Sequence, residues 1–198
     1  MQCRAKVRFT DRLMPYRMQV CICPKAKKRT YTLISSTTLS STSASVVFSS
    51  IPSTYTDLAI RASVRSDSAG TTVHDFTYRI NGLTTSIYSK TQVTGNGSAA
   101  QSYRQTTTRF IFENMLDGAS ATTNTFSNLE IYIPSYAAAY NKQIPHFGVS
   151  ENNATLSGIN AMAGYYIDST AISQLEFYTS GYNFVSGSTF YLYGIKNS

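Results

Sequence analysis

Most of this chain is divided into short runs of alternating apolar and polar residues, each closed by residues that favour turns. Leu58, Ile60 and Val64 illustrate the pattern. Because successive side chains of a β-strand point to opposite faces, a period of two predicts a strand with one buried face. Asn81-Gly82, which follows a similar run, is a dipeptide typical of tight turns. The runs that we expect to form strands lie at residues 31–34, 46–48, 58–64, 76–80, 110–112, 129–133, 147–149, 161–165, 175–177 and 190–194.

Roughly nine to eleven short strands at even spacing predict an all-β chain, an antiparallel β-sandwich of the jelly-roll-like kind. Composition divides the chain at residue 30 into an extended basic arm, 1–30, and one β-sandwich domain, 31–198. Polar low-complexity segments at 35–45, 94–100 and 117–125 predict surface loops. Residues 136–140, two tyrosines with three alanines between them, are long enough for one helical turn.

The excess positive charge of the chain lies in the arm. The arm holds nine basic residues and one acid, 9 − 1 = +8, whereas the remaining 168 residues hold eight basic and nine acidic residues, 8 − 9 = −1. Three interpretations stay open: the arm binds nucleic-acid phosphates, it is a leader outside the mature protein, or it lies on the acidic surface of a neighbouring subunit. We favour the third and do not expect a nucleic-acid partner, because only Phe9 and Tyr16 interleave with the basic residues. The predicted partner-binding residues of the arm are Arg4, Lys6, Arg8, Arg12, Arg17, Lys25, Lys27, Lys28 and Arg29.

The sequence offers no assembled catalytic or metal-binding motif. His74 precedes Asp75 in an expected strand, so the two side chains point to opposite faces, and His146 has no acid nearby in sequence; we expect both histidines to be structural. Glu113 and Asp117 are close in sequence, but we expect a strand end to separate them. The cysteines, at 3, 21 and 23, lack the second pair that a zinc site needs. We therefore predict no enzyme, no catalytic residue, no metal and no cofactor.

Tyrosine is unusually frequent, with 15 residues against no tryptophan. Tyrosine is amphipathic and recurs on adaptable binding surfaces, although many tyrosines simply fill strands. The predicted surface contacts are Tyr136, Tyr140, Tyr165, Tyr166, Tyr191 and Tyr193.

Five runs of the domain resemble a family of small tailed-bacteriophage virion proteins, frequent in phages of marine and freshwater bacteria, including cyanophages. The runs lie at 31–36, 51–58, 128–134, 151–154 and 190–196, and the most specific are Ile-Pro-Ser-Thr-Tyr-Thr-Asp-Leu at 51–58 and Leu-Tyr-Gly-Ile-Lys at 192–196. The resemblance covers residues 31–198 and implies a jelly-roll-like sandwich with a structural role. It supplies no catalytic residues, and the arm departs from its pattern.

Two functions from different classes are compatible with these features. The first, which we favour, is a capsid decoration or cement protein that binds and stabilises the shell. The second is a module of a tail fibre, tail spike or head fibre that binds host-surface carbohydrate. The expected partners are other virion proteins, either the major capsid protein or tail proteins, together with copies of the chain itself, with a trimer favoured. No run of about 18 apolar residues is present, so we expect no membrane span, and the expected location is the phage particle, assembled in the bacterial cytoplasm.

Overall fold

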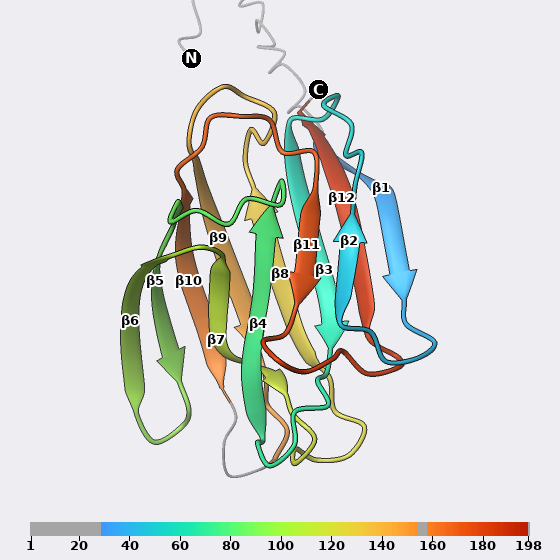
Figure 1. The fold of residues 1–198 in the computed structure, drawn as a ribbon, viewed down its shortest axis with the longest axis vertical. Helices are drawn as coiled ribbons and strands as arrows, with labels where there is room; N and C mark the ends of the chain where they lie inside the picture. The colour runs from blue at the N-terminus through green and yellow to red at the C-terminus, as the bar shows by residue number, and fades with distance from the viewer. Residues whose placement is uncertain (1–28, 154–157, 198) are drawn as a thin grey trace, which may run out of the picture.

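The computed structural model describes residues 29–153 and 158–197, and these residues form twelve β-strands and no helix (Figure 1). The strands are β1 (Arg29–Thr38), β2 (Ser45–Phe48), β3 (Asp57–Val64), β4 (Val73–Ile80), β5 (Tyr88–Gly95), β6 (Ala100–Thr107), β7 (Phe110–Asp117), β8 (Ser127–Ile133), β9 (Lys142–Val149), β10 (Ile159–Tyr166), β11 (Leu175–Tyr178) and β12 (Thr189–Asn197). The first described strand, β1, starts at Arg29 and so includes the last two residues of the segment predicted as the arm.

The strands form two sheets packed face to face. The large sheet has the order β1-β12-β3-β8-β9-β10-β5-β6, and the small sheet has the order β2-β11-β4-β7. Four antiparallel pairs join early strands to late ones: β1 with β12, β2 with β11, β3 with β8, and β4 with β7. These pairs alternate between the sheets, as in a hairpin ribbon wound into a jelly roll. The predicted all-β, jelly-roll-like sandwich is confirmed, with β9, β10, β5 and β6 extending its large sheet.

The core lies between the sheets and is rich in aromatic rings. Leu58, Ile60 and Val64 are fully buried on the inner face of β3, as their alternation predicted. Phe177 of β11 packs between Phe76 and Phe190. The centroid of its ring lies 5.7 Å from that of Phe76 and 5.8 Å from that of Phe190. Because the inner faces of both sheets contribute to this core, the alternate side chains of each strand must lie on the outer face of its sheet.

Side chains from β5 cover the open edge of the small sheet. Lys90 donates to the carbonyl oxygen of Ile111 on β7, and the Gln92 side chain both donates to the Glu113 carbonyl at 3.0 Å and accepts from the Glu113 amide at 3.2 Å. Backbone groups at a sheet edge need such partners when they are buried. The inner face of β5 is therefore polar for a structural reason.

Several local predictions were wrong. β5 and β6 were not predicted, and the segment expected as a loop at 94–100 is the tight hairpin turn between them together with their ends. Residues 136–140 form a turn without a helix, in which the Ala138 amide donates to the Ser135 carbonyl. Ser35 and Thr38 belong to β1 rather than to the expected loop, and Glu113 and Asp117 both lie within β7.

Candidate binding face on the large sheet

The side of the large sheet that faces away from the small sheet, here called the outer face, exposes large apolar side chains. Leu33 on β1, Phe147 on β9, Ile159 on β10 and Val93 on β5 are each 51–54% exposed. The outer faces of antiparallel sandwiches are usually polar. Large exposed apolar side chains on neighbouring strands, as on β9, β10 and β5, are instead typical of a surface that contacts another molecule.

A hollow of about 400 Å³ lies on the outer face where β12, β3, β8 and β9 run side by side. Tyr191 and Tyr193 are stacked beside it with centroids 6.3 Å apart, and Tyr31 meets Tyr193 edge-on at 6.2 Å. Arg61 lies 6.0 Å from the Tyr31 ring and forms an ion pair with Glu130 at 3.6 Å. The hollow therefore combines flat aromatic surface with charged and hydrogen-bonding groups. Its lining residues include Arg61, Ser63, Asn128, Glu130, Phe147 and Thr189.

A second hollow, of about 950 Å³, crosses β5, β10, β9 and β8. Short side chains such as Ala161 and Ala163 line it together with the longer Arg104, Tyr132 and Tyr165. Tyr165 also lines a neighbouring hollow of about 490 Å³ with Tyr140, where its hydroxyl accepts from Asn141 Nδ2 at 2.8 Å. The outer face is thus hollowed along most of its width.

Four of the six predicted surface tyrosines lie at these hollows: Tyr140, Tyr165, Tyr191 and Tyr193. The prediction was wrong for Tyr136 and Tyr166, which are fully buried. Tyr166 follows Tyr165 on β10 and so points inward, where it packs 5.3 Å from Tyr88. Tyr136, in the β8–β9 connection, packs into the core and donates to the Pro52 carbonyl.

The basic residues predicted to bind a partner mostly lie outside the described residues. This applies to Arg4, Lys6, Arg8, Arg12, Arg17, Lys25, Lys27 and Lys28, whereas the backbone of Arg29 opens β1. Conversely, sequence analysis missed Arg61, Phe147 and Ile159 as members of the outer face. The available signal was that residues 159–166 carry apolar side chains at both odd and even positions, so that one apolar set must face outward.

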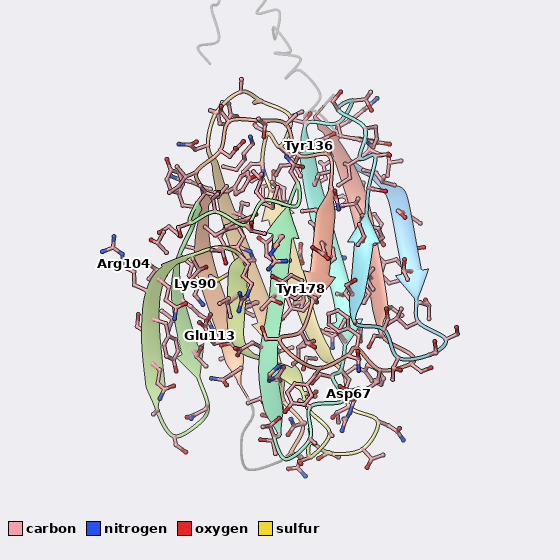
Figure 2. The ribbon with its side chains drawn as sticks, in the orientation of Figure 1. Asp67, Lys90, Arg104, Glu113, Tyr136 and Tyr178 are labelled. Carbon is pink, nitrogen blue, oxygen red and sulfur yellow. The ribbon has the colours of Figure 1, made fainter. Side chains whose placement is uncertain are left out.

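Two pairs of ionisable groups lie between the sheets. The Lys90 ammonium, with its side chain 1% exposed, bonds the Glu113 carboxylate, and Figure 2 shows the two residues facing one another from β5 and β7. Burial lowers the pKa of Lys90, although the bond to Glu113 opposes that shift. His146 Nε2 lies 2.6 Å from the Tyr78 hydroxyl, and burial lowers the pKa of this histidine to about 3. Lys90 and His146 belong to strands that line the second hollow, but the two residues are only 2% and 4% exposed. Neither side chain is therefore accessible from that hollow.

Fold and surface together define this chain as a jelly-roll β-sandwich with an apolar, hollowed outer face. Within residues 29–153 and 158–197, no group of three His, Cys, Asp or Glu side chains is placed to hold a metal ion. In the same ranges, no helix has the length and apolar character needed to cross a membrane. No family model, no curated protein and no solved structure matches the chain. The resemblance to phage virion proteins therefore stays a prediction.

Proposed function

We propose that this chain is a non-enzymatic structural protein of a tailed-phage particle, a decoration protein that binds the capsid shell through the outer face of its large sheet. The observation that carries the proposal is the group of half-exposed apolar side chains Phe147, Ile159 and Val93 on the neighbouring strands β9, β10 and β5, with Leu33 similarly exposed on β1. A broad apolar face of this kind suits a protein surface better than a small ligand. The jelly roll recurs in viral capsid proteins, which is support by analogy of fold alone.

The basic arm fits the same proposal. Its charge of 9 − 1 = +8 over residues 1–30 would be attracted to an acidic neighbouring subunit, while the outer face provides the area that is buried. Copies of the chain around a symmetry point of the shell would add contacts between shell subunits. A shell stabilised in this way resists heat and the pressure of packaged DNA.

Particles stripped of the protein are expected to release DNA at lower temperature, and adding back the purified chain should restore the original release temperature. Phe147→Lys should bind stripped particles at least about tenfold more weakly, because a charge replaces an apolar contact residue. Val47→Lys is the matched control, since Val47 is 45% exposed on β2 of the small sheet and Phe147 is 51% exposed. Unchanged release temperature on stripping, or equal loss of binding in both variants, would count against the proposal.

The first hollow favours a second candidate, binding of host-surface carbohydrate by a tail or head fibre. The stacked Tyr191 and Tyr193 offer the flat aromatic surface on which sugar rings pack, and Arg61, Glu130 and Asn128 offer hydrogen bonds. Tyr193→Ala should then lower the affinity for host polysaccharide roughly 10-fold, because the variant loses one aromatic contact with a sugar ring. Equilibrium binding of labelled polysaccharide measures this, with Tyr140→Ala as the control. A high copy number per particle, with no polysaccharide binding, would exclude this second candidate.

A further inference from the structure

Strand β6 (Ala100–Thr107) forms one border of the large sheet and is exposed on both faces. It pairs with β5 over eight consecutive residues without a bulge, and no described residue pairs with its other edge. Ser102, Arg104 and Gln105 are all exposed. The outer edge of β6 therefore carries an unbroken row of backbone N–H and C=O groups with which no described strand pairs.

Among the described residues, the borders at β7, β2 and β1 each carry a feature that hinders strand pairing, whereas β6 carries only the single charge of Arg104. Lys90 and Gln92 cover the edge of β7, β2 is only four residues long, and a bulge between Leu33 and Ser35 interrupts β1. Short strands, bulges, charges and proline are the usual devices that stop edge strands from pairing. β6 contains no proline and no acid, and its one charged residue is Arg104.

We propose that β6 pairs with β6 of a second copy of this chain, antiparallel across a two-fold axis centred on Tyr103. Only another strand satisfies a row of alternating backbone donors and acceptors. An axis perpendicular to the sheet keeps each face continuous, so residues that meet must differ by an even number of positions. Centring on Tyr103 sets the two tyrosines opposite each other, Ser102 opposite Arg104, and Gln101 opposite Gln105.

The sequence of β6 favours this register over its neighbour. Centring the axis on Arg104 would set two guanidinium groups directly opposite each other, and like charges in that position are destabilising. In the Tyr103 register each Arg104 faces an uncharged serine, and an aromatic pair occupies the axis. Strand composition thus selects one pairing out of the two central ones.

Space for a second copy exists because β6 projects beyond the small sheet. β7, the nearest border of the small sheet, is held by side chains of β5 rather than β6. Figure 1 shows β6 at the left margin of the molecule, outside β7, and Figure 2 shows Arg104 extending away from the ribbon. Two large sheets could therefore join at β6 without bringing the small sheets together. This dimer does not depend on the proposed function, which uses the outer face instead.

Sedimentation equilibrium of the full chain over a concentration series tests the pairing. We expect a reversible dimer. Ser102→Lys sets a lysine opposite Arg104 twice in each dimer and should weaken association about 2- to 30-fold, whereas Ser102→Glu should tighten it by a similar factor. The double variant Ser102→Lys with Arg104→Glu restores opposite charges and should recover most of the lost affinity.

Thr32→Lys is the matched control, because Thr32 is an exposed threonine on β1, the opposite border of the same sheet. It should leave the dimer unchanged, and circular dichroism should show native strand content in every variant. A monomer at all concentrations would overturn the proposal. A dimer that ignores the charge at Ser102 would also overturn it, as would one that Thr32→Lys dissociates, since the interface would then lie elsewhere.

Discussion

Glu113→Ala is expected to lower the free energy of unfolding by about 3 to 5 kcal/mol, because it leaves the Lys90 ammonium buried without its counter-ion. The Lys90 side chain is 1% exposed, and its other bond is to the neutral Ile111 carbonyl. Breaking one half of a buried pair costs far more than the intact pair contributes. Urea unfolding followed by circular dichroism measures the change, since the chain has no tryptophan to report by fluorescence.

The exposed pair between Arg61 and Glu130 provides the control. Its side chains are 57% and 45% exposed with the charges 3.6 Å apart, so Glu130→Ala should cost less than about 1 kcal/mol. The deficit of Glu113→Ala should also shrink as the pH rises toward 10.5, the ordinary lysine pKa. Burial lowers the pKa of Lys90, and it lowers it further in Glu113→Ala, which lacks the bond that opposes the shift. As the pH rises, native Glu113→Ala therefore releases the Lys90 proton before wild type does, while its unfolded chain still binds it, so the stability of the variant rises toward that of wild type. Equal costs for both variants would contradict a buried, charge-compensating role for Glu113.

The strands that were predicted and those that were missed differ in how they are buried. β3 and β8 place apolar residues such as Ile60 and Ile131 on one face, so their period of two is visible in the sequence. β5 has the same period of burial, but its inward positions hold Lys90, Gln92 and Thr94. β6 is exposed on both faces and has no hydrophobic period at all. Alternation therefore detects strands only where the buried face is apolar.

The outer face could be predicted only in part for a related reason. Tyr191 and Tyr193 are two positions apart, so the sequence places them on the same face of their strand. Their neighbours in the first hollow are Arg61 on β3 and Phe147 on β9. These two residues precede Tyr191 in the chain by 130 and 44 positions (191 − 61 = 130, 191 − 147 = 44). Strand order across the sheet, which brings them together, follows from the jelly-roll winding and the inserted hairpins rather than from any local pattern.

His146 illustrates a structural role that the sequence suggested but could not explain. Its Nδ1 lies 3.3 Å from the Met162 carbonyl oxygen, which can only accept, so Nδ1 carries the proton of the neutral ring. Nε2 is then the acceptor, and the Tyr78 hydroxyl donates to it at 2.6 Å. Protonation of Nε2 would reverse this bond, so that the ring donates to the Tyr78 hydroxyl, and would place a charge among Tyr78, Phe110 and Phe112, which surround the ring. The neutral imidazole is therefore part of the packed core.

We expect His146 to make the fold acid-sensitive. Burial lowers the pKa of His146 from 6.5 to about 3, so between these values the unfolded chain binds a proton that the native chain does not. The free energy of unfolding should accordingly fall by about 1.4 kcal/mol for each pH unit below 6.5, and the fall ends near pH 3. His146→Gln keeps hydrogen-bonding groups but does not titrate. It should be less stable than wild type at pH 7, and its deficit should narrow by about 3 kcal/mol between pH 6.5 and 4.

Tyr78→Phe separates the titration from the hydrogen bond. It removes the donor to Nε2 but leaves His146 buried, so its stability should lie about 1 kcal/mol below wild type at every pH and follow the same slope. Urea midpoints of the three proteins, measured at half-unit steps of pH, give the comparison directly, because the carboxylates common to all three cancel in the differences. A deficit of His146→Gln that stays constant from pH 7 to 4 would mean that the imidazole is not held neutral by the core, and that the acid sensitivity of the fold has another origin.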